Sequence, residues 1–243
     1  MKEAKAVLDL GPWGTRERID RFLETATGVS DLSARIAYIS GQFLGVPYRH
    51  PTLIGSPDVP EELIVNLGLV DCFTYLDYVD GMRLSRSFDE FIEKLTWIRY
   101  KDGVVAYEKR RHFFTDWIDT DRVNDVTAEI GMSGSRSVTK ALNARSDGSP
   151  FVPGIPTVSR TLSVAPPAIA PSAQGRLHTA DYVGIFEETE GLDVSHVGLA
   201  IEGARKGSWL FRHASSVQGK VVDQDLNDYL ASKPGIIVLR PQP

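Results

Sequence analysis

The sequence predicts an α+β fold in which N-terminal helices pack on a C-terminal antiparallel β-sheet. Between about residues 15 and 120, apolar residues recur at the spacing of amphipathic helices. Between about residues 176 and 243, they instead alternate with polar residues, as in half-buried strands. Helices followed by strands along one chain are typical of the α+β class.

Two amphipathic helices open the predicted fold. The segment GTRERIDRFLETATG places Ile19, Phe22 and Leu23 on one helical face. The segment DLSARIAYISGQFLG repeats this pattern and ends at Gly45, a residue type that commonly follows helices. A loop rich in proline and glycine comes next, so the chain is irregular before the third helix.

The third predicted helix begins beside the only cysteine of the chain, Cys72. From Asp71 onward the apolar side chains are spaced three and four residues apart, until Gly81 interrupts the pattern. Asp71 suits the N-cap position because its carboxylate can accept the amide hydrogens of Phe73 or Thr74. We therefore expect Cys72 to be the first residue of this helix.

Two further helical segments are predicted before residue 120. A capping box of Ser87 and Glu90 opens the segment FDEFIEKLTWIRY. The segment YEKRRHFFTDWI places His112 and Asp116 one helical turn apart, a spacing that suits a metal only if further ligands join them. The favoured interpretation is a helix with an apolar face. The residues that we expect to be buried there are Phe113, Trp117 and Ile118.

The segment between about Gly131 and Gly175 is rich in serine, proline, glycine and small apolar residues. Its prolines exclude long helices. We predict extended chain and short strands that cover a globular body, so that residues 1–243 form a single domain. A linker between two domains is the alternative interpretation.

Four strands are predicted in the last part of the chain, over DYVGIF, SHVGLAIE, WLFRHASS and GIIVLR. The turn GARKGS joins the second strand to the third. If this turn is centred between Ala204 and Arg205, His196 lies opposite His213, with Cβ atoms about 4.5–5.5 Å apart. A slip of two residues would keep both histidines on one face.

The other face of this predicted hairpin is apolar. Val197, Leu199 and Ile201 alternate with the residues that share the face of His196. We therefore expect these three side chains to supply the core beneath the histidines.

Cys72 is a candidate nucleophile. Unpaired amide hydrogens and the positive end of the dipole at a helix start favour the thiolate, which is the reactive form of cysteine. A Cys–His hydrolase needs a base and a group that fixes the imidazole tautomer, which here would be His196 and His213. A buried structural cysteine and two surface histidines are the alternatives.

The order of DCFTY, GLDVSHVGLAI and FRHASS resembles the NlpC-like papain-fold cysteine hydrolases of bacterial cell walls. The resemblance is closest to their branch of N-acetylmuramoyl-L-alanine amidases, and it includes GVPY and RRHFFTDWI. It implies a papain-like core with Cys72 as nucleophile, His196 as general base and His213 as third member. The family often has threonine where this chain has Phe73, and glycine where it has Ala180.

The resemblance also implies a substrate and a reaction. The reaction is hydrolysis of the amide between N-acetylmuramic acid and L-alanine, in peptidoglycan or in muropeptides, without a cofactor or metal. The candidate substrate-binding residues are Tyr48, Asp71, Phe73 and Ser195.

Three other functions stay open at this point. They are a stem-peptide endopeptidase of the same fold, a zinc amidase that uses His196, His213 and another of the five histidines, and an inert peptidoglycan-binding module.

Composition excludes two classes of partner. The net charge of -5 argues against nucleic acid, because nucleic-acid binding depends on clustered Lys and Arg. No apolar run reaches the roughly 18 residues of a membrane span. The first residues lack the apolar region of a secretory signal. Since the implied substrate lies outside the cytoplasm, we expect a periplasmic or secreted enzyme whose leader is missing from this sequence.

Overall fold

The computed structural model describes residues 6–167, 176–205 and 207–243. The chain divides into two compact units, of which unit 1 comprises Met1–Arg111 and His213–Val222. Unit 2 comprises His112–Arg212 and Asp223–Pro243. Residues 168–175 of the predicted extended segment, and residue 206 of the predicted turn, lie outside the described residues. The single domain over residues 1–243 stays a prediction.

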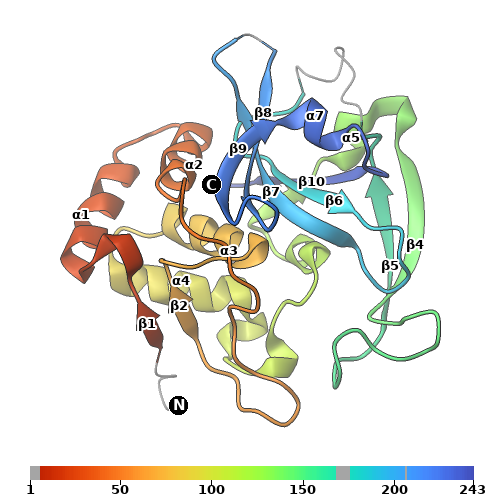
Figure 1. Cartoon of the computed structure of the whole chain (residues 1–243), viewed down its shortest axis with the longest axis horizontal. Helices are drawn as coiled ribbons and strands as arrows, with labels where there is room; N and C mark the ends of the chain where they lie inside the picture. The colour runs from red at the N-terminus through yellow and green to blue at the C-terminus, as the bar shows by residue number, and fades with distance from the viewer. Residues whose placement is uncertain (1–5, 168–175, 206) are drawn as a thin grey trace. The chain divides into compact units, whose positions relative to one another are not determined.

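The described part of unit 1 contains four α-helices, which confirm the predicted helical segments up to residue 99 (Figure 1). Their apolar stripes are buried, as Ile19 and Leu23 in the first helix and Phe43 just after the second show. The Phe43 ring packs against Tyr75 of the third helix, with centroids 5.6 Å apart. The helices are α1 (Arg16–Thr27), α2 (Leu32–Gly41), α3 (Cys72–Arg83) and α4 (Phe88–Arg99).

Gly81 does not end α3, which continues to Arg83. A Cβ atom at Gly81 would lie 3.1 Å from the Phe91 ring of α4. The glycine therefore interrupts the apolar pattern without ending the helix, and its lack of a side chain allows close packing between the two helices.

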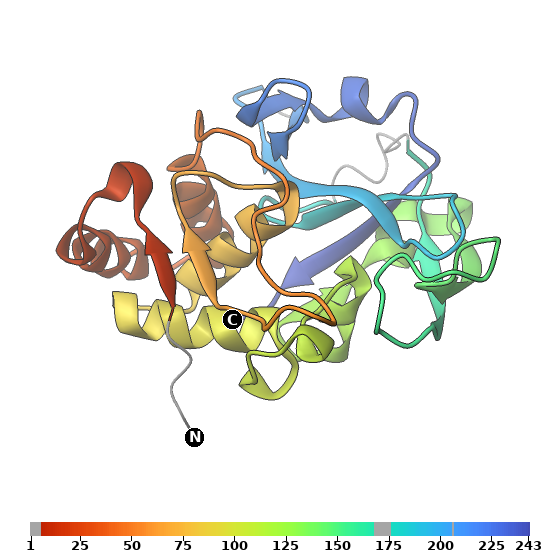
Figure 2. The same cartoon turned by 60° about the horizontal axis from the view of Figure 1, so that its bottom comes forward.

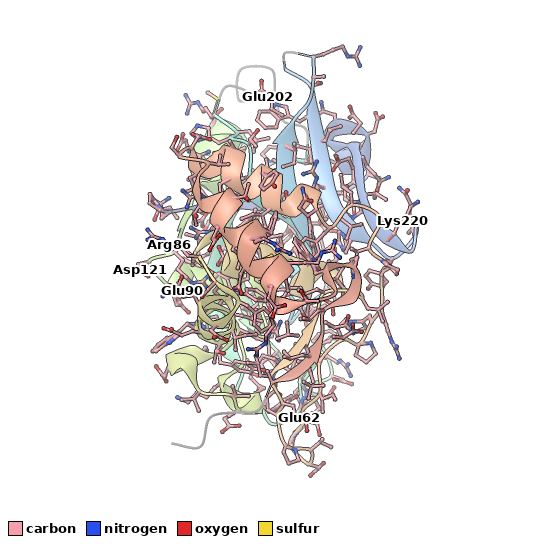
Figure 3. The ribbon with its side chains drawn as sticks, turned by 90° about the vertical axis from the view of Figure 1, so that its left-hand side faces the viewer. Glu62, Arg86, Glu90, Asp121, Glu202 and Lys220 are labelled. Carbon is pink, nitrogen blue, oxygen red and sulfur yellow. The ribbon has the colours of Figure 1, made fainter. Side chains whose placement is uncertain are left out.

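The predicted capping box at the start of α4 forms only in part. Ser87 Oγ accepts a hydrogen bond from Glu90 N–H at 3.2 Å, as expected. The Glu90 carboxylate, however, accepts from Arg86 N–H at 2.8 Å, and these two residues lie close together in Figure 3. In a complete capping box, the Glu90 carboxylate would accept a hydrogen bond from the N–H of the N-cap, Ser87. Here it accepts one from the preceding residue, Arg86.

Unit 1 also contains short elements that the sequence pattern did not predict. A parallel pair of strands runs side by side in Figure 2, where Val7 pairs with Ile64. These strands are β1 (Val7–Asp9) and β2 (Ile64–Asn66), and the 3₁₀-helices are η1 (Gly11–Trp13), η2 (Lys101–Gly103) and η3 (Tyr107–Lys109).

A six-stranded antiparallel sheet has the strand order β3-β10-β6-β7-β8-β9. It confirms the predicted α+β class and the four predicted strands, which are β6, β7, β8 and β10. The short β3 and β9 were not predicted. The strands are β3 (Val123–Asp125), β6 (Tyr182–Phe186), β7 (Val194–Glu202), β8 (Trp209–Ser215), β9 (Lys220–Asp225) and β10 (Ile236–Pro241).

The proline-rich segment of unit 2 carries two paired strands. Arg136 pairs with Val164 and Leu142 with Val158, so the pair is antiparallel over its whole length. The strands are β4 (Arg136–Leu142) and β5 (Val158–Val164). Unit 2 also contains the helices α5 (Thr127–Gly131), η5 (Met132–Gly134) and α7 (Leu226–Leu230).

The helix predicted over YEKRRHFFTDWI is wrong. The segment forms η3 and a second 3₁₀-helix, η4 (Phe114–Asp119), and Arg110 and Phe113 between them have extended backbone. Asp116 Oδ2 accepts a hydrogen bond from Phe113 N–H at 3.1 Å. Such local bonds from aspartate compete with a continuous α-helix. Trp117 is fully buried, as expected.

The predicted register of the β7–β8 hairpin is also wrong, by two residues. Leu199 pairs with Arg212 and Ala200 with Phe211. Gly203 N–H donates to Ser208 O at 2.8 Å, so the turn is centred one residue later than predicted. His196 is therefore not paired with His213. Among the described residues, no helix has the length and apolar character needed to cross a membrane.

Candidate active site

Cys72 is the first residue of α3, and its side chain is partly buried. Asp71 is the N-cap, as predicted: its Oδ1 accepts from the N–H groups of Phe73 at 3.0 Å and Thr74 at 2.8 Å. Asp71 N–H donates in return to Thr74 Oγ1 at 3.0 Å. This reciprocal capping box fixes the helix start and hence the position of the thiol.

The segment that contains Tyr48 is hydrogen-bonded on both sides. Tyr48 N–H donates to Gly219 O at 2.8 Å on one side. On the other side, Val70 N–H donates to Pro47 O at 3.1 Å. Val70 directly precedes Asp71, so this strand-like segment runs beside the start of α3.

The hydroxyl of Tyr48 lies in the electrostatic field of the start of α3. Burial raises the pKa of Tyr48, and negative charge at Cys72 and at Asp71 raises it further. The phenol therefore stays protonated over a wide pH range and can act as a hydrogen-bond donor beside the thiol.

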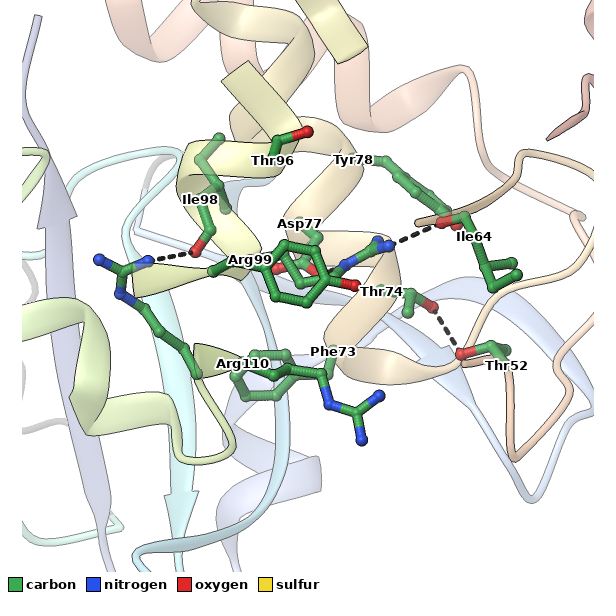
Figure 4. A network of polar contacts seen from close by, with 12 residues as sticks. Thr52, Ile64, Phe73, Thr74, Asp77, Tyr78, Thr96, Ile98, Arg99 and Arg110 are labelled. Carbon is green, nitrogen blue, oxygen red and sulfur yellow. Dashed lines mark hydrogen bonds and ion pairs between the residues drawn. The ribbon is translucent and has the colours of Figure 1, made fainter. Parts of the chain in front are cut away.

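Two residues that the sequence did not single out complete this part of the site. Thr52 Oγ1 donates to Asp71 Oδ2 at 2.7 Å, and His50 Nδ1 lies 3.4 Å from the same oxygen. Thr52 Oγ1 also lies 3.4 Å from Thr74 Oγ1 (Figure 4). The loop before α3 is irregular, so no sequence pattern indicated which of its side chains reach Asp71.

A buried ion pair joins α3 to α4 in the part of α3 that follows the capping box. Arg99 Nε of α4 lies 2.8 Å from Asp77 Oδ2 of α3, and both side chains are 2% exposed. Arg99 Nη1 also donates to Ile64 O at 2.6 Å (Figure 4). One guanidinium thus joins α3, α4 and β2, which holds the helix of Cys72 in place.

His196 lies next to a β-bulge in unit 2. Ile185 pairs with His196, but the following Phe186 pairs with Val194, so Ser195 is the extra residue. Bulges re-aim side chains and are frequent next to active sites. Ser195 is exposed, and its Oγ lies 3.5 Å from Ile185 O.

The imidazole of His196 packs among aromatic rings. Its centroid lies 6.0 Å from that of Phe211 and 6.3 Å from that of Tyr229. These residues border an apolar cluster that includes Ile185 and Ala200. The face of the sheet that carries His196 is therefore itself core, rather than an open polar face.

The opposite face of β7 is buried as well. Val197, Leu199 and Ile201 are at most 8% exposed, which confirms the predicted core positions. The Phe114 ring of η4 lies over Gly184, where a Cβ atom would be 2.7 Å from it. A strand that is covered on both faces leaves His196 few rotamers.

Two buried polar side chains, missed by sequence reasoning, hold the bulged end of β7. Asp193 accepts from Thr115 N–H at 2.7 Å and from Val194 N–H at 2.8 Å, and burial raises its pKa. The ammonium of Lys140 donates to three carbonyls of the loop that precedes Asp193. The three are those of Glu187, Thr189 and Leu192.

His213 lies in β8, and only 2% of its surface is exposed. A histidine buried to this extent has to satisfy its ring nitrogens inside the protein.

The suggested metal pair of His112 and Asp116 has a different role. Asp116 Oδ1 lies 3.3 Å from Arg160 Nη1, and its other oxygen accepts from Phe113 N–H. Within the described ranges, no group of three or more His, Cys, Asp or Glu side chains is placed to hold a metal ion.

Solved structures with similar folds include two from Bacteroides. A structure from Bacteroides uniformis described as an N-acetylmuramoyl-L-alanine amidase is 27% identical, with a TM-score of 0.73, and the match covers 87% of this chain and 99% of that one. A Bacteroides fragilis structure described as a putative xylanase is 28% identical, with a TM-score of 0.63, over 83% of this chain and 98% of that one.

A protein from Legionella pneumophila shares the fold over more of the chain. It is 22% identical, with a TM-score of 0.78, and the match covers 94% of each chain. No curated protein matches the sequence. Residues 38–236 match the family described as AmiA-like, N-acetylmuramoyl-L-alanine amidase-like. The chain therefore belongs to the N-acetylmuramoyl-L-alanine amidase-like family.

Proposed function

We propose that this protein is a cysteine-dependent amidase that cleaves the bond between N-acetylmuramic acid and L-alanine in peptidoglycan or muropeptides. The observation that carries the proposal is the position of the only cysteine, at the first residue of α3 and inside the stretch that matches the family. A thiol at a helix start is placed for conversion to the thiolate.

The proposed reaction has two steps. His196 takes the proton of the Cys72 thiol, and the thiolate attacks the lactyl carbonyl to form a tetrahedral oxyanion. His196 then protonates the L-alanine amine, which leaves as the C–N bond breaks, and a thioester remains. Water, activated by His196, hydrolyses the thioester and restores the thiol. His213 orients the imidazole of His196 in this scheme.

The capping box limits which groups can stabilise the oxyanion. The N–H groups of Phe73 and Thr74 donate to Asp71. We therefore assign the oxyanion donors to the Cys72 N–H and to the protonated hydroxyl of Tyr48. Phe73 and Ser195 are proposed to contact the substrate, with Asp71 at the base of the site.

The fold type, the domain organisation and the location of the protein are proposed from the same family resemblance. We propose a papain-like, NlpC-type core within one domain, since a helix that begins with the cysteine precedes an antiparallel sheet in both. We also propose that the protein acts in the periplasm or after secretion, because its proposed cell-wall substrate lies outside the cytoplasm.

The test is mass spectrometry of a disaccharide-tetrapeptide muropeptide incubated with wild type, with Cys72→Ala and with wild type in EDTA. We expect release of intact peptide with a free L-alanine amine, lost in Cys72→Ala and kept in EDTA. Cleavage inside the peptide would favour the endopeptidase, loss in EDTA would favour the zinc amidase, and full activity of Cys72→Ala would overturn the proposal.

A second measurement isolates the role of the histidine. Because the chain has one cysteine, alkylation by iodoacetamide reports on Cys72 alone. We expect His196→Ala to shift the pH profile of alkylation toward that of an ordinary thiol, with a midpoint of about 8.5. An unchanged profile would remove His196 from the mechanism.

A further inference from the structure

His50 is held beside the start of the nucleophile helix, and the mechanism above does not use it. Its Nδ1 lies 3.4 Å from Asp71 Oδ2, and its side chain is 70% exposed. Asp71 directly precedes Cys72 and caps α3. A carboxylate one residue from the nucleophile therefore positions this imidazole.

The contact with Asp71 determines which edge of the ring faces outward. A carboxylate only accepts hydrogen bonds, so Nδ1 carries the proton in this contact. Nε2 lies on the far edge of the ring, and the high exposure of the side chain leaves that edge accessible. His50 thus presents one oriented polar atom to a bound molecule.

The chain on either side of His50 is fixed to residues near Cys72. Arg49 N–H donates to Val70 O at 2.9 Å, and Thr52 Oγ1 donates to Asp71 at 2.7 Å. The side chain of Arg49 is exposed. Two exposed basic side chains on a segment fixed in this way favour an anionic ligand beside the thiol.

We propose that His50 is a specificity-determining residue that binds the α-carboxylate of the D-glutamate in the stem peptide. The inference rests on the proposed function, in which the cleaved bond ends at L-alanine and D-glutamate follows. That carboxylate lies about two residue lengths, roughly 7 Å, from the scissile bond. In the complex, Nε2–H of the imidazolium donates to the carboxylate and Nδ1–H donates to Asp71.

A matched pair of substrates tests this contact. The pair is two disaccharide-tetrapeptides that differ only in D-glutamate against D-isoglutamine, in which a neutral amide replaces the α-carboxylate. We expect wild type to favour the carboxylate substrate at least about fivefold in kcat/KM, mainly through KM. His50→Gln should bring the ratio close to one, and His50→Arg should restore it.

Arg49→Gln is the control for long-range attraction, since its side chain is exposed on the same segment. We expect it to keep the ratio within about twofold, because exposed charges are screened by salt. A ratio unchanged in His50→Gln, or abolished equally in Arg49→Gln, would overturn the inference and leave the amidase intact. If wild type cleaves neither substrate, the proposed function fails and the inference fails with it.

Discussion

Removal of the Asp77 carboxylate should destabilise the protein more than any exposed ion pair does. Asp77→Ala leaves the Arg99 guanidinium 2% exposed and without its carboxylate. Burial of an unpaired charge costs about 3–5 kcal/mol. Burial lowers the pKa of Arg99, but Asp77 together with Tyr78 and Tyr100 raises it above its ordinary value, so the side chain keeps its charge in wild type. We therefore expect a loss of about 3–5 kcal/mol for Asp77→Ala.

The double variant separates the ion pair from the packing around it. In Asp77→Ala with Arg99→Met neither charge of this pair remains, and the main loss is the Ile64 carbonyl without its donor, about 1–3 kcal/mol. The double variant should therefore be less destabilised than the sum of the singles, by at least about 2 kcal/mol. An apolar replacement of a buried pair is often tolerated in this way.

Urea denaturation followed by circular dichroism measures these free energies. Asp89→Ala is the matched control, since Asp89 pairs with Arg16 at 3.3 Å with side chains 86% and 52% exposed. It should change stability by at most about 0.5 kcal/mol. Additive losses in the double variant, or equal losses for Asp77→Ala and Asp89→Ala, would refute the reasoning.

Three further substitutions test individual side chains that are buried or partly buried. Gly184→Ala would place a Cβ atom 2.7 Å from the Phe114 ring, and we expect thermal unfolding to show a loss of about 1–3 kcal/mol, not a gain. Burial raises the pKa of Glu61, so its contribution is present below about pH 4.3 and is lost as the pH rises through the raised pKa. The stability difference between wild type and Glu61→Gln should therefore fall as the pH rises above about 4.3, and a constant difference would contradict the burial argument. Lys140→Met removes the donor to three carbonyls and should speed amide hydrogen exchange in residues 187–192, whereas unchanged protection would show that the loop does not depend on it.

Local sequence patterns predicted the features that depend on neighbouring residues. The helix stripes of α1 and α2, the N-cap at Asp71 and the four main strands follow from periodicity and capping chemistry within a few residues. These signals are short-range, because a side chain three or four residues away occupies the same helix face in any fold. The position of Cys72 at the start of α3 belongs to this class.

Features that depend on distant partners could be decided only by the tertiary structure. The β7–β8 register depends on where the turn closes. A slip of two residues leaves every side chain on the same face of the sheet, so the alternation of apolar and polar residues cannot distinguish the two registers. The contacts of Asp71 with Thr52 and His50, and of Asp193 with Thr115, join residues from 19 to 78 positions apart. By itself, the sequence determined the helices α1 to α4, the four main strands and the candidate nucleophile. Only the folded chain decided which polar groups hold them in place, because a hydrogen-bond partner is chosen by proximity in space and leaves no periodic trace.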